Sequence, residues 1–233
     1  MQTRGLNARQ LKTIATVAMA IQHMALLFLP PDSPYYWPLV SLGHITAPIM
    51  CFFIAEGYYH THDRRRYALR LLLGAVLSHM PHALAFGFPI YAFWRYTSIF
   101  WSLFLGLIAL SAAENTRLPG ILRFLIPLAC CVLAYPGNWN CIAVIWILGF
   151  GLFREAPVKK WGFFLLGLGV YVLEFFVISN TDLLLPRFSV LAAIPLLLCY
   201  NGQRGDRSAF SKWGFYAFYP THLLALHLIQ AML

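Results

Sequence analysis

Histidine and glutamate side chains in apolar stretches are the residues of this chain that are best suited to chemistry. His23 lies in the first apolar stretch, while His44 and Glu56 lie in the second. An ionisable group in an apolar span costs about 2.5 to 3.5 kcal/mol on insertion scales, so it usually faces the protein interior and marks a site. A neutral imidazole can take a proton from a nucleophile or carry an acyl group itself. We therefore expect His23 to be the leading candidate for a general base.

The same residues also have structural interpretations. A buried histidine often only donates to a backbone carbonyl or contacts a serine or threonine. Glu56 precedes His60 by four residues, so the two side chains would form an i,i+4 pair at the membrane interface. The histidines have no carboxylate-rich setting and no i,i+4 histidine pair, and for this reason no metal site is expected.

The composition is that of an integral membrane protein. Of the 233 residues, 60% are hydrophobic and 11% are charged, whereas about 25% are charged in a typical soluble domain. We expect an all-α fold, a polytopic transmembrane helical bundle that forms a single domain over residues 1–233. About nine spans are predicted, at 11–29, 39–59, 67–88, 98–113, 121–135, 141–153, 161–178, 188–200 and 214–232.

The distribution of positive charge predicts the orientation of these spans. With a cytoplasmic N-terminus, only Arg95 and Arg187 of the 17 lysines and arginines fall outside, as the positive-inside rule requires. This accounts for the formal charge of +9, so membrane lipids and not nucleic acid are the expected anionic partners. The chain is therefore predicted to be a multi-pass membrane protein.

Several of the basic side chains on the predicted inner side form two groups. Arginine forks bind phosphate in a bidentate manner, and the set as a whole predicts a polyphosphate cradle, although membrane orientation and anionic lipid suffice to explain any single member. The candidate phosphate-binding residues are Arg64, Arg65, Arg66, Arg70, Arg204 and Lys212.

Three segments of the chain resemble the TraX family of membrane proteins. They read LKTIATVAMAIQHM at 11–24, APIMCFFIAEGYYHTHDRRRYALRLL at 47–72 and YNGQRGDRSAFSKWGFYAFYPTHLLAL at 200–226. Founding members of that family acetylate the N-terminus of conjugative F-type pilin. The resemblance implies acetyl-coenzyme A as the acyl donor, which the basic set would hold, and a location in the bacterial inner membrane.

The family's motifs can be carried over by position. Its Asp-His pair in the first span is Gln22-His23 here, its Gly-Arg pair is Gly43-His44, its Asp-Tyr pair is Asn138-Trp139, and its closing histidine is His222. The resemblance implies that His23 acts as general base or transient acetyl carrier, supported by His222 or Glu56. The residues at positions that depart from the family, which would contact the acceptor substrate, are Gln22, His44 and Asn138.

Sequence and resemblance together predict an acetyltransferase that moves an acetyl group from cytosolic acetyl-coenzyme A to an acceptor amine or hydroxyl. The acceptor would be a pilin-like protein or a glycan. Two alternatives stay open: a non-catalytic membrane component of a conjugation or secretion apparatus, and a proton-coupled transporter that uses the histidines and Glu56 as a relay. Both a monomer and a dimer are compatible with the short outer loops.

Overall fold

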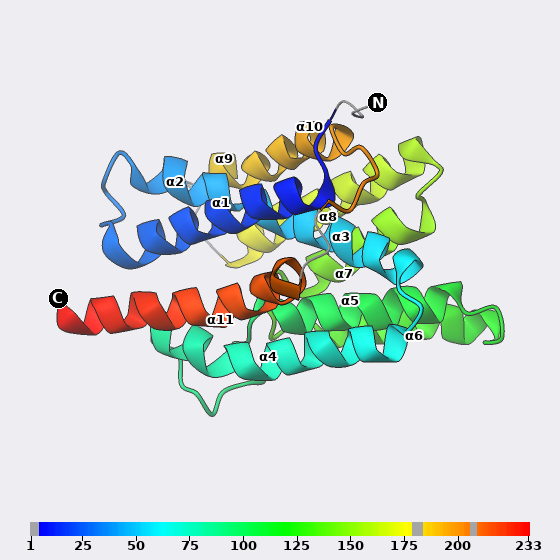
Figure 1. Cartoon of the computed structure of the whole chain (residues 1–233), viewed down its shortest axis with the longest axis horizontal. Coiled ribbons are helices and arrows are strands. Elements are labelled where there is room, and N and C mark those ends of the chain that lie inside the picture. The colour runs from blue at the N-terminus through cyan, green and yellow to red at the C-terminus, as the bar shows by residue number, and fades with distance from the viewer. Residues whose placement is uncertain (1–4, 179–183, 206–208) are drawn as a thin grey trace. The chain divides into compact units, whose positions relative to one another are not determined.

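The computed structural model describes residues 5–178, 184–205 and 209–233, with side chains for 5–174, 184–205 and 213–233. The regular elements in these ranges are helices (Figure 1). They are α1 (Ala8–Phe28), α2 (Tyr36–Gly43), α3 (Thr46–His60), α4 (Arg64–Phe86), α5 (Ile99–Glu114), α6 (Gly120–Leu133), α7 (Asn140–Leu152), α8 (Pro157–Ile178), α9 (Leu184–Arg187), the 3₁₀ helix η2 (Phe188–Ala192), α10 (Ala193–Leu198) and α11 (Ala209–Met232).

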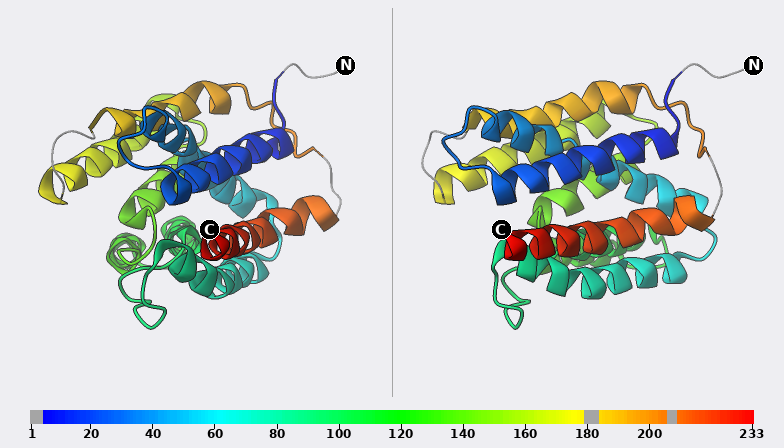
Figure 2. Two further views of the ribbon diagram at one scale, coloured as in Figure 1. Left: turned by 90° about the vertical axis from the view of Figure 1, so that its left-hand side faces the viewer. Right: turned by 60° about the vertical axis from the view of Figure 1, so that its left-hand side comes forward.

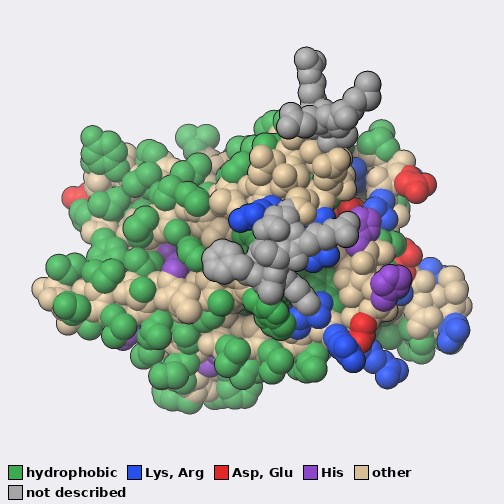
Figure 3. Space-filling model, in the orientation of Figure 1, with side chains coloured by type: hydrophobic (Ala, Val, Ile, Leu, Met, Phe, Trp, Pro, Cys, Tyr) green, Lys and Arg blue, Asp and Glu red, His purple; other side chains and the backbone are tan. Residues whose placement is uncertain are grey.

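The regular elements of the described residues are helices that lie in the predicted apolar stretches, so the all-α prediction is confirmed. Within the described residues, three helical segments are long and apolar enough to cross a membrane: Ala8–Phe28, Tyr36–His60 and Arg64–Phe86. Hydrophobic side chains cover much of the face seen in Figure 3. A row on α4 illustrates this, because Leu69, Leu73, Val76, Leu77 and Met80 are each more than half exposed. Nine crossings and a cytoplasmic N-terminus stay predictions.

Two of the predicted stretches are interrupted, where the sequence predicted continuous spans. The stretch 39–59 is divided by a turn at His44 and Ile45, between α2 and α3. The stretch 188–200 lies in a segment that changes from α9 to η2 and then to α10. Hydropathy detects the length of an apolar run, but not a turn in which the backbone bonds are satisfied by neighbouring side chains.

Clustering of the backbone divides the chain into two compact units. The first unit contains Met1–Met50 and Ile178–Leu233, and the second contains Cys51–Val177. Both ends of the chain thus belong to the first unit. The prediction of a single functional domain over 1–233 stays a prediction.

In the first unit, α1 packs against α2 and α11, and α2 packs against α9 and η2 (Figures 1 and 2). A capping box starts α1: the Gln10 amide donates to Asn7 Oδ1 over 3.0 Å, and the Asn7 amide donates to Gln10 Oε1 over 2.9 Å. The buried face of α1 includes Leu11, Ala15 and Met19 at helical spacing. This face is what directs His23 toward the interior.

In the second unit, α5 packs against α4, α6 and α7. Small residues let these helices approach closely, as is common where helices associate in membranes. A Cβ atom on Gly106 would meet Ile147, and one on Gly167 would meet the Trp146 indole. Trp146 is fully buried, and its Nε1 donates to the Phe164 carbonyl over 3.0 Å.

We expect Gly43→Val to destabilise the protein, because a Cβ at this position would meet the Cβ of Gln22 where α2 crosses α1. Overpacking of this kind costs about 1 to 3 kcal/mol. The matched control is Gly169→Val, since a Cβ at that helical glycine meets nothing within 4 Å. Thermal unfolding of both variants in the same detergent checks the prediction. Equal melting temperatures would show that α1 and α2 can separate at no cost.

Candidate functional site

His23 is held in the interior of the first unit by α1. Its side chain belongs to the buried face of that helix, together with Thr16 and Met19, and only 5% of the residue is exposed. Spacings of three and four residues place these side chains on one face of the helix. No acidic or basic side chain shares this face of α1 in the turns around His23. The partner of the imidazole comes from a different helix.

That partner is His222 of α11, which also belongs to the first unit. His23 Nδ1 and His222 Nε2 are 2.8 Å apart, and the two rings lie nearly parallel, with centroids 5.1 Å apart. The Tyr219 ring presents an edge-on arrangement to both imidazoles. The structure thus brings together two of the three predicted catalytic residues.

The hydrogen bonds of the pair assign its tautomers in the neutral state. His222 Nδ1 lies 2.7 Å from the Phe218 carbonyl, one turn earlier in α11, so this nitrogen must carry the proton that it donates. His222 Nε2 is then an acceptor, and His23 Nδ1 must donate to it. Each neutral ring is then unprotonated at Nε2: that of His222 accepts the hydrogen bond from His23, and that of His23 is the nitrogen that can take up a proton.

This arrangement has the order of a nucleophile-activating relay. A base is oriented by a second group, which is itself fixed by a third, as in enzymes that deprotonate a nucleophile. Here His23 occupies the position of the base, His222 that of the orienting group, and the Phe218 carbonyl that of the third group. A proton accepted at His23 Nε2 gives an imidazolium that His222 Nε2 stabilises by accepting its Nδ1 hydrogen.

Gln22 and His44 also lie in the first unit, and both are neighbours of Gly43, Gln22 by packing and His44 in the sequence. Gln22 packs directly against Gly43, which has no side chain to keep the two helices apart. His44 Nδ1 donates to the Pro186 carbonyl over 2.9 Å, and the Ser189 hydroxyl donates to the same carbonyl over 2.6 Å. His44 therefore satisfies a backbone carbonyl of the interrupted segment α9 to α10. Substrate contacts by Gln22 and His44 stay predictions.

Glu56, the third predicted catalytic residue, belongs to the second unit, where it contacts His60 and Arg154. Its Oε2 lies 3.7 Å from His60 Nε2, which is the i,i+4 pair that the sequence indicated. Its Oε1 lies 3.2 Å from Arg154 Nη2. The Arg154 guanidinium also lies over the Tyr59 ring, 4.4 Å from its centroid. These contacts support the structural interpretation of Glu56, and a catalytic role stays a prediction.

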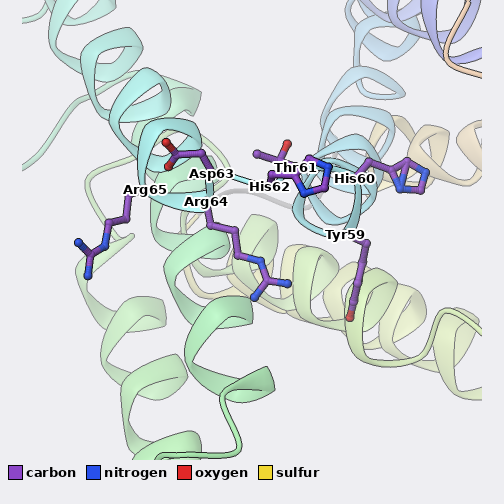
Figure 4. A pocket seen from close by; sticks show the side chains of 7 residues that line it. All are labelled: Tyr59, His60, Thr61, His62, Asp63, Arg64 and Arg65. Atoms are coloured by element: carbon purple, nitrogen blue, oxygen red, sulfur yellow. The ribbon is translucent and has the colours of Figure 1, made fainter.

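A cleft of about 1050 Å³ opens where α3 ends and α4 begins (Figure 4). We call it the basic cleft. Figure 4 shows that the Arg64 and Arg65 side chains diverge, with Arg64 on the side of Tyr59. The Arg64 guanidinium lies 4.0 Å from the centroid of the Tyr58 ring, which holds it in a defined position. The residues that line the cleft are Tyr59, His60, Thr61, His62, Asp63, Arg64 and Arg65.

The other residues predicted to bind phosphate differ from Arg64 and Arg65. Asp63 caps the start of α4 by accepting from the Arg66 amide at Oδ1. Its Oδ2 lies 2.9 Å from Arg66 Nε, so the two side chains also form an ion pair. Arg70 lies one turn further along and contacts the Tyr67 ring. Arg204 is exposed in the first unit, and the side chain of Lys212 lies outside the described residues. A cradle that combines both groups stays a prediction.

Asn138 lies in a short connection between α6 and α7 in the second unit. Its side chain is exposed, whereas its backbone is fixed: the Asn138 amide donates to the Thr97 carbonyl over 3.0 Å, and the Ser102 hydroxyl donates to the Asn138 carbonyl over 3.1 Å. The next residue, Trp139, has φ +66°, which is strained for a residue with a large side chain. Strain of this kind persists where surrounding contacts enforce it, often near functional sites.

Sequence patterns did not indicate two of these contacts. Arg154 was recognised only as one of the inner basic residues, because nothing local relates it to Glu56, 98 positions earlier. Asn140 was not recognised at all, although its side-chain Nδ2 donates to Glu174 Oε1 over 2.7 Å. Local sequence carried no signal for either contact, because Asn140 and Glu174 are also 34 positions apart.

Comparisons with known proteins agree with the resemblance seen in the motifs. Residues 7–230 match the family described as TraX protein. The chain is also 29% identical over 231 residues to a protein of Dichelobacter nodosus named probable fimbrial assembly protein FimC, serogroup H1, and the match covers 94% of each chain. No solved structure matches.

Proposed function

Because the chain belongs to the TraX family, we propose that it is a membrane-embedded acetyltransferase. It moves an acetyl group from acetyl-coenzyme A to an acceptor amine or hydroxyl. The observation that carries the proposal is the relay from the Phe218 carbonyl through His222 to His23. A buried base whose tautomer is fixed by two hydrogen bonds is suited to the deprotonation of a nucleophile.

The relay suits a simple sequence of proton transfers. The acceptor nitrogen or oxygen attacks the thioester carbonyl as its proton passes to His23 Nε2. The carbon–sulfur bond then breaks, and the departing thiolate takes the proton back from His23. In the variant with a transient acetyl-histidine, His23 Nε2 attacks the thioester first and expels the thiolate of coenzyme A. The acceptor then attacks the acetyl carbonyl, the imidazole leaves, and the proton of the acceptor passes to the thiolate. Both routes require the tautomer that the Phe218 and His222 contacts favour.

The basic cleft is the proposed place for the phosphates of coenzyme A. Arg64 and Arg65 supply two guanidinium forks, and His60 and His62 supply further donors around a volume of about 1050 Å³. Guanidinium groups bind phosphate with two parallel hydrogen bonds each, which suits a pyrophosphate with a separate phosphate monoester. The cleft lies at the end of the helices that the charge distribution assigns to the cytoplasm.

A role in pilus biogenesis is the proposed context for this reaction. The relative in Dichelobacter nodosus is named a probable fimbrial assembly protein. The acceptor would then be a pilin-like protein in the bacterial inner membrane, with a surface glycan as the alternative, and the chain would cross the membrane about nine times with its N-terminus in the cytoplasm.

A non-catalytic component of a pilus or conjugation apparatus is the second candidate. The word assembly in the name of the relative describes such a role as well as it describes an enzyme. In that case the departures at Gln22, His44 and Asn138 would reflect lost chemistry. This candidate predicts a folded protein that does not bind coenzyme A.

Binding and hydrolysis of acetyl-coenzyme A by the detergent-purified protein test the proposal. We expect saturable binding by calorimetry and slow release of free thiol, with water in place of the acceptor. A propionyl or dephosphorylated donor serves as the matched ligand control. Folded protein that neither binds nor hydrolyses the donor would remove the acetyltransferase and favour the second candidate.

A further inference from the structure

Glu174 is a carboxylate in an apolar helix, and the residues that the structure describes place no cation in an ion pair with it. It lies in the last turns of α8, in the second unit, and is partly buried. Glu56 in the same unit has Arg154 as a counter-ion and lies near His60. In the part of the chain that the structure describes, no lysine, arginine or histidine forms an ion pair with Glu174, and its hydrogen-bond partner is the neutral Asn140. A carboxylate in such surroundings requires a counter-cation or a proton.

Asn140 holds the Glu174 carboxylate in one orientation. Its Oδ1 accepts from the Ile142 amide over 3.3 Å, and this contact directs Nδ2 toward Glu174 Oε1 at 2.7 Å. The two contacts fix which end of the amide faces the carboxylate. The start of α7 thus orients the carboxylate of α8 without neutralising its charge.

Aromatic rings stand beside the carboxylate on both helices. Tyr171 precedes Glu174 by one helical turn, and Trp139 precedes Asn140. The Trp139 and Tyr171 ring centroids are 4.8 Å apart, so the aromatic pair lies next to the pair formed by Asn140 and Glu174. Indole and phenol rings attract a cation to their faces.

The connection that carries Trp139 is held in place. The Thr97 amide donates to the Pro136 carbonyl over 2.8 Å, and the Asn138 amide donates to the Thr97 carbonyl. Gly137 is packed against Ser102, where no side chain would fit. These contacts enforce the positive φ values of Trp139 and Asn140, which place the indole and the amide on the same side as α8.

We propose that Glu174, Trp139 and Tyr171 form a binding site for a primary ammonium group. The carboxylate supplies the opposite charge, and the indole and phenol supply the faces that attract an organic cation. A calcium or magnesium ion would instead take six or more oxygen ligands, and the described residues of this site offer one carboxylate. Nothing in the sequence motifs or in the related proteins assigns this role to these residues.

The location suggests which ammonium group binds there. α7 has 13 residues and is therefore about 20 Å long. Asn140 begins this helix, while Tyr59 of the basic cleft donates to the Gly151 carbonyl near its other end. The ammonium site and the basic cleft thus lie at opposite ends of one helix. The identification of the ligand as the acceptor amine rests on the proposed acetyl transfer, whereas the ammonium site itself does not.

Binding of alaninamide to the full-length protein in detergent, by calorimetry at pH 6.5, tests the site. At this pH the amine is protonated, and N-acetylalaninamide is the neutral control. We expect alaninamide to bind and N-acetylalaninamide not to bind. Glu174→Gln should weaken alaninamide binding about tenfold to a hundredfold, and Tyr171→Leu, which keeps the carboxylate, should weaken it less. Glu155→Gln, at an exposed carboxylate beyond the other end of α7, should leave it unchanged.

Equal binding of both probes, no binding of alaninamide, or full affinity in Glu174→Gln and Tyr171→Leu would each overturn the proposal. Any of these results would indicate that Glu174 is neutralised by a proton and not by an ammonium ligand. Binding of acetyl-coenzyme A to the same wild-type preparation separates the two ideas. Protein that binds alaninamide but no donor retains the ammonium site and loses the acetyltransferase, and the opposite result loses only the ammonium site.

Discussion

Replacement of His23 by alanine is expected to lower acetyl transfer by about 10²- to 10⁴-fold, which is the usual contribution of a positioned general base. The buried imidazole lies at the end of the relay through His222, so its removal eliminates the nitrogen that takes the proton. Donor affinity should stay near the wild-type value, because the proposed site for the phosphates is the basic cleft, which His23 does not line. Single-turnover transfer from radiolabelled acetyl-coenzyme A, together with donor binding, measures both quantities.

His222 should behave as a positioning residue and not as the base. His222→Ala keeps the His23 imidazole but removes its hydrogen-bond partner, and losses of this kind are about 10- to 100-fold. His227→Ala is the matched control, since it removes the same side chain from a later position of α11. Full activity in His23→Ala, with the protein folded, would exclude His23 from the mechanism. A larger loss in His222→Ala than in His23→Ala would exchange the two roles.

The second large effect is expected at the basic cleft, where the structure distinguishes neighbouring arginines. Arg64 lines the cleft and is held over the Tyr58 ring, whereas Arg66 does not line it and is paired with Asp63. Loss of a charge-assisted contact to phosphate costs about 1.5 to 3 kcal/mol. Arg64→Ala should therefore weaken donor binding about tenfold to a hundredfold, and Arg66→Ala should change it little.

The comparison of these two variants is sharp because each removes one positive charge from the same helical turn. If the donor were held only by general electrostatic attraction, both variants would lose the same donor affinity. A difference in donor affinity between the two variants is expected only if the cleft is the donor site. Arg65→Ala should weaken donor binding as Arg64→Ala does, because Arg65 also lines the cleft. Equal affinities for all three variants and the wild type would place the donor at another site.

Membrane class and helical content could be predicted from the sequence, because both depend on local properties of the chain. Runs of apolar residues that are interrupted by proline, glycine and basic residues specify where helices begin and end. The first span was predicted at 11–29, and the helix runs from Ala8 to Phe28, with Thr16 and His23 on its buried face. The contact between Glu56 and His60 was also local, since four residues make one turn of a helix.

The partners of the functional side chains were decided by the tertiary structure. His23 and His222 are 199 positions apart, Arg154 is 98 positions from Glu56, and Glu174 is 34 positions from Asn140. Periodicity indicates which face of a helix is buried, but it does not indicate which other helix covers that face. The sequence by itself determined that His23 is an imidazole in an apolar helix and predicted that it faces inward. Only the packing of α11 against α1 decided that a second imidazole fixes its tautomer, because a hydrogen bond requires two atoms within about 3 Å and no local pattern encodes that distance.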